Sequence, residues 1–269
     1  MKSSGGNSML NKLLKNDLKK NMHWLWILFV ATLAIAGIDR LCKEIGESVA
    51  FFKIVGIIFD SAFYALAVNI ILQPFLRNFL NFSKSLYSDE SYLTHTLPVT
   101  KNELINSKFL TAIIEITSGF ACLVLSLIIM FAGPGALDFI KLLLATIIVG
   151  EIPIILVLAL FVALVIVEFL MFISIIYFAI VVAYKSKEKR IFKSFLITAI
   201  CAFSALAVLA IVMLIVLSIC GVELSASTLI LSRKAFFCVI ATGIIIYSAI
   251  AVLFYFLTKR EFNKGVNID

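Results

Sequence analysis

Residues 153–184 read PIILVLALFVALVIVEFLMFISIIYFAIVVAY and contain one charged side chain, Glu168. A run of this kind is typical of a helix that crosses a lipid bilayer, because about 20 apolar residues span the hydrocarbon core. The whole chain has the same character: 62% of its 269 residues are hydrophobic, 14% are charged and the mean hydropathy is +1.12. Soluble domains contain roughly 25% charged residues. The composition therefore predicts an all-α integral membrane protein, whose spans are helices because backbone hydrogen bonds must close internally in lipid.

Five other apolar stretches predict five further spans, near residues 22–38, 54–76, 109–131, 192–220 and 236–257. The apolar stretch 137–184 is too long for one crossing and too short for two with a comfortable loop. It is interrupted at residues 150–153. We interpret 138–150 as a reentrant helix that dips into the outer leaflet, and 153–184 as span four, with Pro153 in its first turn.

The distribution of Lys and Arg distinguishes six spans from the alternative of seven. With six spans and both ends inside, 17 of the 23 basic residues lie on the inner side and six on the outer side. Seven spans would move the clusters at 185–193 and 259–264 to the outside. Because cytoplasmic loops carry the excess of basic residues, the count favours six spans with both termini in the cytoplasm. The clusters lie beside apolar runs, which argues against nucleic-acid binding as the reason for the net charge of +7.

The first residues divide into two parts. Residues 1–8, MKSSGGNS, precede a second Met and are interpreted as a remnant of an expression tag, outside the fold. Residues 9–21 carry leucines on one helical face and lysines on the rest. This pattern predicts an amphipathic helix in the cytoplasmic headgroup layer; the alternative is a cytosolic helix that extends span one. Residues 9–269 are predicted to form a single membrane domain.

Enzyme motifs are absent from the sequence. It contains no HExxH, GxSxG or GxxxxGK[ST] pattern, and its two histidines are not paired with a cysteine at useful spacing. The five cysteines form no CxxC pair, so neither a disulfide framework nor a zinc site is expected, and we interpret them as small apolar residues. We therefore predict no catalytic residue, no metal site and no cofactor in this chain.

The most distinctive segment is the inner connection 77–108, which reads RNFLNFSKSLYSDESYLTHTLPVTKNELINSK. Its mixture of aromatic and acidic residues is typical of a protein–protein contact; the alternative is a solvated connector. Pro98 interrupts the segment. Thr100 and Glu103 then have the spacing of a capping box, which predicts the start of a helix that continues into span three.

This connection resembles the cytoplasmic segment of type-2 ABC-transporter permeases from Gram-positive bacteria. In that family an acidic-aromatic stretch leads into TLPV(S/T)…E(L/I)…SK, and residues 87–108 read YSDESYLTHTLPVTKNELINSK. Residues 255–268, YFLTKREFNKGVNI, are similar to the C-terminal tails of the same family. With the predicted spans, the resemblance covers nearly all of 9–269. Within the family, the chain is most similar to exporters of amphipathic peptide toxins of the phenol-soluble-modulin type.

The resemblance implies a permease subunit in a bacterial plasma membrane, exporting an amphipathic peptide or, alternatively, a lipid or drug. A second permease, either a copy or a paralogue, and two cytosolic ATPases would complete the transporter. ATP and Mg²⁺ would bind to the ATPases, so this chain would not itself be an enzyme. The connection 77–108 would contain the coupling helix, and the residues carried over to its ATPase contact are Tyr87, Asp89, Glu90, Tyr92, Leu93, Thr96 and Leu97. The alternative function is an ion-coupled secondary transporter or channel, although the sequence shows no matching halves with Gly- or Pro-broken spans.

Four carboxylates lie within or beside apolar runs: Asp60, Glu115, Glu151 and Glu168. An ionisable group inside a span is costly and is by default a functional candidate. No Lys or Arg lies deep in a predicted span, so we expect no salt bridge to these groups within the chain. Asp60 and Glu168 are our translocation-path candidates, which would attract cationic or amphipathic cargo; the alternative is that they form hydrogen bonds between packed helices.

Overall fold

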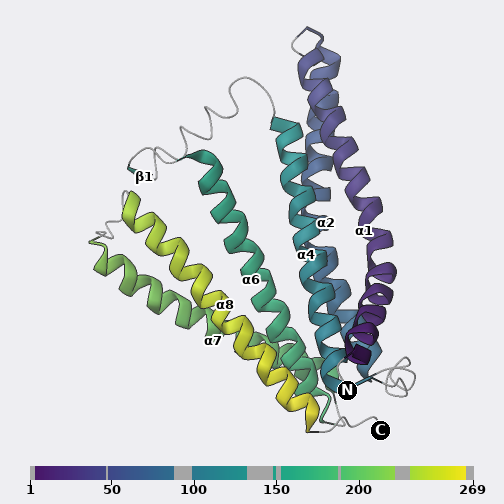
Figure 1. Ribbon diagram of the computed structural model, residues 1–269. Coiled ribbons are helices and arrows are strands. Elements are labelled where there is room, and N and C mark those ends of the chain that lie inside the picture. The colour runs from purple at the N-terminus through teal and green to yellow at the C-terminus, as the bar shows by residue number, and fades with distance from the viewer. Residues whose placement is uncertain are drawn as a thin grey trace. The chain divides into compact units, whose positions relative to one another are not determined.

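The computed structural model describes residues 4–46, 48–87, 99–131, 148–149, 153–186, 189–221 and 231–264 (Figure 1). Its helices are α1 (Ser4–Gly46), α2 (Ala50–Tyr87), α4 (Lys101–Phe131), α6 (Ile154–Ala183), α7 (Arg190–Ile219) and α8 (Arg233–Asn263). Within these described residues, six helices are long and apolar enough to cross a bilayer. The chain is therefore a multi-pass membrane protein, as the composition predicted.

The first helix is continuous through the boundary that the sequence analysis placed at residue 21. α1 begins at Ser4 and ends at Gly46, so the segments 9–21 and 22–38 form one helix. The amphipathic segment therefore extends span one, and its position in the headgroup layer or in the cytosol stays a prediction. Neither Pro nor Gly occurs between residues 7 and 36, so nothing interrupts the backbone hydrogen bonds there.

The predicted capping box at the start of the third apolar helix is confirmed. The Thr100 backbone N–H donates to Glu103 Oε2 at 2.8 Å, and the Glu103 backbone N–H donates to Thr100 Oγ1 at 3.3 Å. These two contacts satisfy backbone donors that a helix N-terminus otherwise leaves free. α4 accordingly begins at Lys101, well before the predicted apolar part of span three.

The predicted reentrant helix falls mostly on residues outside those described. Its residues Ile148–Val149 form a short strand, β1, and not a helix. This strand pairs in parallel with β2, Leu231–Ser232, which immediately precedes α8. Pro153 is the N-cap of α6 and not a residue of its first turn, and its carbonyl accepts hydrogen bonds from the backbone N–H groups of Leu156 and Val157.

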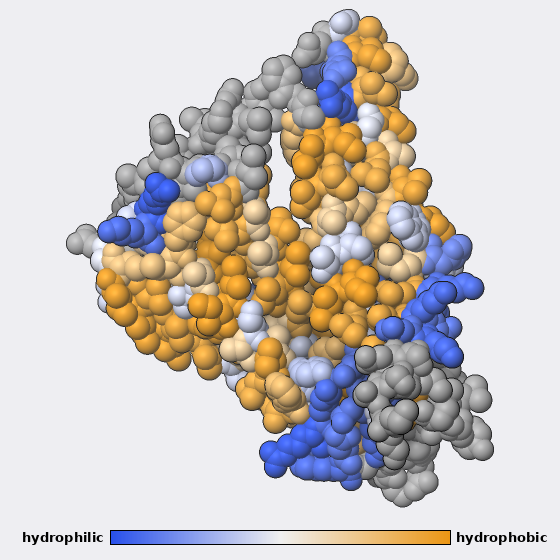
Figure 2. All heavy atoms as spheres, viewed as in Figure 1, coloured by the Kyte–Doolittle hydropathy of each residue, from blue (hydrophilic) through white to orange (hydrophobic). Residues whose placement is uncertain are grey.

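The chain divides into two compact units, Met1–Gly133 with α1, α2 and α4, and Pro134–Asp269 with α6, α7 and α8. The core of the N-terminal unit includes Leu25, Phe29, Ile70 and Cys122, and that of the C-terminal unit includes Met171, Ile175, Ala205 and Tyr247. In Figure 2, hydrophobic residues cover the sides of the helices and hydrophilic residues gather toward the helix ends. Such an apolar exterior is solvated by lipid in a bilayer.

Candidate functional site

Asp60, one of the two predicted path residues, forms an ion pair within the chain. Lys43 Nζ on α1 lies 2.7 Å from Asp60 Oδ1 on α2. The expectation that no such salt bridge exists was wrong, because α1 continues past the predicted end of span one at residue 38 and carries Lys43 alongside α2. The pair therefore fixes the two helices of the α1–α2 hairpin to each other.

A second carboxylate shares the same ammonium group. Lys43 Nζ also lies 2.7 Å from Oδ2 of Asp39, a fully buried residue on α1. We name Asp39, Lys43 and Asp60 the Lys43 triad. The Lys43–Asp39 contact is an ion pair without good hydrogen-bond geometry, and among the described residues neither Asp39 oxygen has a hydrogen-bond partner. With all three groups ionised, two carboxylates face one cation, an arrangement that is costly when buried.

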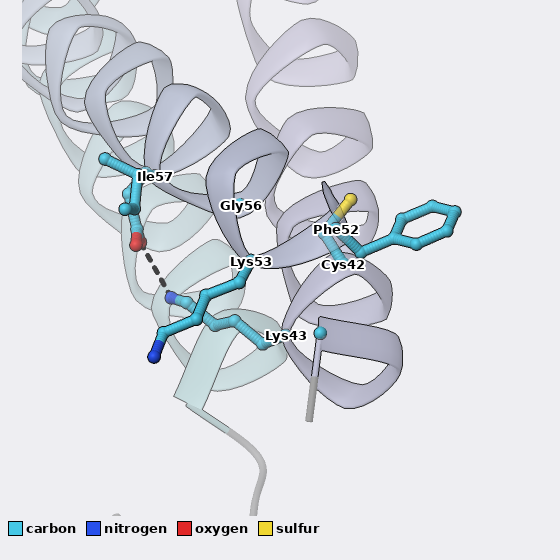
Figure 3. A pocket seen from close by; sticks show the side chains of 8 residues that line it. Cys42, Lys43, Phe52, Lys53, Gly56 and Ile57 are labelled. Carbon is cyan, nitrogen blue, oxygen red and sulfur yellow. Dashed lines mark hydrogen bonds and ion pairs between the residues drawn. The ribbon is translucent and has the colours of Figure 1, made fainter. Parts of the chain in front are cut away.

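A pocket of about 400 Å³ opens beside the triad, between the end of α1 and the start of α2 (Figure 3). Its lining residues are Cys42, Lys43, Gly46, Phe52, Lys53, Gly56, Ile57 and Asp60. The helices approach closely here: a Cβ on Gly46 would lie 3.1 Å from the Lys53 backbone nitrogen. Sequence reasoning missed Asp39 and Lys43, although their spacing of four residues on one helix indicates a pair.

Glu115 lies fully buried between the helices of the N-terminal unit. Its Oε2 accepts a hydrogen bond of 2.8 Å from Asn78 Nδ2 on α2. Its Oε1 has no hydrogen-bond partner among the described residues. Asn78 also donates to the carbonyl of Pro74, four residues earlier on its own helix, at 2.8 Å. This buried amide therefore links α2 to a carboxyl group of α4.

Three further polar contacts join α1 to its neighbours at the same end of the unit. Asn81 Nδ2 donates to Asn21 Oδ1 at 2.6 Å, and Lys108 Nζ lies 2.8 Å from Asp17 Oδ1. Ser107 Oγ donates to the other oxygen of Asp17 at 3.1 Å. Together with Asn78 and Glu115, these residues form what we name the polar network. It connects the first part of α1, the last part of α2 and the first part of α4.

Glu168, the second predicted path residue, lies on α6 in the C-terminal unit. The hydroxyl group of Tyr247 on α8 is close enough to its carboxyl group for the two to interact electrostatically. Tyr247 is buried and belongs to the core cluster of this unit. The proximity of Tyr247 is compatible with the interhelical hydrogen bond that the sequence analysis gave as the alternative, and both that role and the path role stay predictions.

The structure describes one of the residues carried over as ATPase contacts. Tyr87 is the half-buried last residue of α2. The others, Asp89, Glu90, Tyr92, Leu93, Thr96 and Leu97, lie outside the described residues, as does Glu151. The two helices that flank residues 88–98, α2 and α4, belong to the same unit and are held by the polar network. Within the described part of the chain, no group of three or more His, Cys, Asp or Glu side chains could hold a metal ion.

Comparison with known proteins gives no match: no family model, no curated protein and no solved structure matches this chain. The fold and the buried polar contacts define its class. It is a multi-pass, α-helical membrane protein, with a polar network between the helices of one unit and an ion-paired pocket at the end of the α1–α2 hairpin.

Proposed function

We propose that this chain is the transmembrane subunit of a type-2 ABC exporter in a bacterial plasma membrane, with both termini in the cytoplasm. The observation that carries the proposal is the sequence of residues 87–108, which resembles the ATPase-contacting segment of that family. The basic-residue count supports a cytoplasmic position for this segment. A cytosolic ATPase can contact it only there.

The arrangement of α2 and α4 supports a mechanical role for the segment between them. α2 is continuous from Ala50 to Tyr87, and α4 is continuous from Lys101 to Phe131. Both helices continue from their apolar stretches to the connection between Tyr87 and Lys101. Near this connection, the polar network joins them to α1. In this proposal ATP binding closes the two ATPases and displaces the segment, and the three helices of the unit move together because these contacts hold them.

The cargo path would form between this chain and a second permease. An amphipathic peptide is the cargo that the resemblance favours, with a lipid or drug as the alternatives. Asp60 and Glu168 remain candidates for the path, where a carboxylate would attract a cationic cargo. The chain would bind no cofactor itself, because ATP and Mg²⁺ belong to the ATPase subunits.

Co-purification with a cytosolic ATPase tests the proposal. We expect a tagged chain, extracted from its native membrane, to recover an ABC ATPase in stoichiometric amount. Charge reversal by Asp89→Lys with Glu90→Lys should abolish the recovery. The matched control is Glu44→Lys, an exposed acid on α1 at the opposite end of the same unit, which should recover the ATPase like the parent.

The competing function, an ion-coupled transporter or channel, gives the opposite result. A chain that purifies alone, moves an amphipathic peptide into liposomes and does not respond to ATP would contradict the ABC proposal. Recovery of the ATPase by the double charge-reversal variant would leave the ABC assignment intact but would exclude Asp89 and Glu90 as its contact.

A further inference from the structure

The pocket at the end of the α1–α2 hairpin carries separate positive and negative groups. Its negative side is Asp60, whose Lys43 partner is shared with the buried Asp39. Its positive side is Lys53, an exposed side chain for which the described part of the chain contains no ion-pair partner. Figure 3 shows the Lys53 and Lys43 side chains extending toward the same side of the pocket. A ligand in this pocket therefore meets one available cation, Lys53, and one carboxylate, Asp60, which shares its Lys43 partner with the buried Asp39.

The charge balance of the Lys43 triad favours an additional cation. Its two carboxylates and one ammonium carry a formal net charge of −1. A ligand ammonium placed against Asp60 would bring this cluster to neutrality. A purely anionic ligand would gain one contact with Lys53 but would be repelled by Asp60, which lines the same pocket. The pocket is therefore suited to a zwitterion and poorly suited to a simple anion.

The position of the pocket and the apolar side chains around it suit a lipid ligand. It lies where α1 and α2 leave their apolar stretches, the level at which charged headgroups meet hydrocarbon. Beside Lys53, the side chains of Phe51, Ile54 and Ile58 on α2 are exposed and apolar. Acyl chains can lie along this apolar surface while the headgroup occupies the pocket, whose volume of about 400 Å³ is in the range of small-ligand sites.

We propose that this pocket binds the headgroup of an aminophospholipid of the phosphatidylethanolamine type. The lipid phosphate pairs with the Lys53 ammonium, and the primary ammonium of the headgroup donates to Asp60. Both contacts are charge-assisted hydrogen bonds, which are stronger than neutral ones. A choline headgroup carries no N–H and cannot donate to Asp60, so it binds more weakly. The lipid adds the missing positive charge beside the triad and stabilises the hairpin; this role does not depend on the transport proposal.

Titration of the purified, delipidated full chain with short-chain lipids tests the site. We expect phosphatidylethanolamine to bind more tightly than phosphatidylcholine or phosphatidylglycerol, measured by native mass spectrometry and by the rise in unfolding temperature. Lys53→Gln and Asp60→Asn should each weaken phosphatidylethanolamine binding by roughly tenfold, the effect of one lost charge-assisted hydrogen bond. Lys101→Gln, an exposed lysine on α4 at the other end of the same unit, is the matched control and should bind like the parent.

Two variants keep the test decisive. Asp60→Asn removes a partner of Lys43 and affects the hairpin itself, whereas Lys53→Gln removes a side chain that is outside the triad. Weaker phosphatidylethanolamine binding in Lys53→Gln, with parental binding in Lys101→Gln, supports the site, and loss of the preference for phosphatidylethanolamine over phosphatidylcholine in Asp60→Asn supports the headgroup contact. Tighter binding of phosphatidylglycerol, equal binding of phosphatidylcholine, or parental affinity in Lys53→Gln would each overturn it.

Discussion

Within each of its two units, this membrane protein uses a different kind of contact to hold its helices together. In the N-terminal unit, buried amides, carboxyl groups and a lysine form contacts between α1, α2 and α4. In the C-terminal unit, the helices are more apolar, and Tyr247, which lies near Glu168, belongs to a cluster of mostly aliphatic side chains. Its ion pair between Lys185 and Glu261 joins the ends of α6 and α8.

This difference matters because lipid is as apolar as leucine. Apolar helices in a bilayer gain no hydrophobic free energy from meeting each other, so close packing and interhelical hydrogen bonds determine their association. The N-terminal unit should therefore depend on individual polar side chains. The C-terminal unit should depend on the fit of its apolar surfaces and tolerate the loss of its ion pair.

The largest effect should come from Asn78→Leu in the N-terminal unit. The substitution removes the donor to the fully buried Glu115 carboxyl group. A buried acceptor that loses its hydrogen-bond donor costs about 1–3 kcal/mol of unfolding free energy, and more when the acceptor is charged, so we expect a loss of about 3 kcal/mol. Tryptophan fluorescence during SDS titration measures this unit selectively, because the two tryptophans of the chain, Trp24 and Trp26, both lie on α1.

Asn69→Leu is the matched control for that substitution. Asn69 lies on the same helix, is exposed, and donates to the carbonyl of Ala65 on its own helix at 2.9 Å. Its replacement should change the unfolding free energy little. Equal losses in the two variants would show that the Asn78–Glu115 contact does not hold the unit together.

Lys108→Met should have the next largest effect. The side chains of Lys108 and Asp17 are 11% and 17% exposed, so the ion pair is mostly shielded from solvent. Its removal leaves Asp17 with Ser107 as its remaining partner in the network and should cost about 2 kcal/mol. The same tryptophan-monitored titration measures the loss. Parental stability in Lys108→Met would contradict the role of this pair.

Gly→Ala substitutions at two positions test close packing in each unit, with smaller expected effects on stability. A Cβ on Gly119 would lie 3.3 Å from the backbone carbonyl oxygen of Ile70, which cannot move aside. A Cβ on Gly243 would meet the ends of the Leu164 and Met213 side chains, which can rotate. Gly119→Ala should therefore destabilise its unit by about 1 kcal/mol. Gly243→Ala should be neutral, because side-chain rotation removes the overlap.

For Gly243→Ala, the reactivity of Cys201 with a maleimide measures the stability of the C-terminal unit. Cys201 is half-buried and packs against the Met171 cluster, so loosening of α6, α7 and α8 exposes its thiol. Gly37→Ala is the control in the N-terminal unit, since no atom lies within 4 Å of its added Cβ. A larger loss from Gly243→Ala than from Gly119→Ala would reverse the comparison.

Lys185→Met should have the smallest effect of the substitutions that are expected to destabilise a unit. Lys185 and Glu261 are 36% and 20% exposed, and Lys264 also pairs with Glu261. Partly exposed ion pairs contribute under about 1 kcal/mol and weaken as salt screens them. We expect a small loss in Cys201 protection that disappears at high salt. A loss as large as that of Lys108→Met would mean that ion pairs hold both units equally.

The helices could be predicted from the sequence because composition and apolar length determine which segments cross a bilayer. The Thr100–Glu103 capping box was equally clear, since it depends on residues three positions apart. The ends of the helices were harder to predict. α1 continues to Gly46 through polar residues that lie beyond the length needed to cross the bilayer. That extension places Lys43 beside Asp60, and the predicted absence of a salt bridge failed for this reason.

The polar network was not predicted because its contacts join residues far apart in the chain. Asp17 and Lys108, or Asn78 and Glu115, meet only after α1, α2 and α4 have packed. In the sequence, each of these residues is a polar side chain near the end of a predicted span, and nothing indicates its partner. The sequence marked Glu115 as a buried acid, but its partner depends on the register between two helices.

Each unit has one connection that the proposed function places in the cytoplasm, and a comparison of these two connections tests that proposal most directly. In the N-terminal unit, residues 88–100 separate the end of α2 from the start of α4. In the C-terminal unit, α6 passes to α7 through residues 184–189. The proposal assigns the ATPase contact to the first connection and none to the second.

Photo-crosslinking from each connection measures that assignment in the intact membrane. Benzoylphenylalanine would replace Tyr92 in the first connection and Ser186 in the second, in cells that produce the chain with its co-purifying ATPase. We expect a crosslink to the ATPase from position 92 and none from position 186. Crosslinks from position 186 alone, or from neither position in a chain that still exports its cargo, would contradict the proposed function.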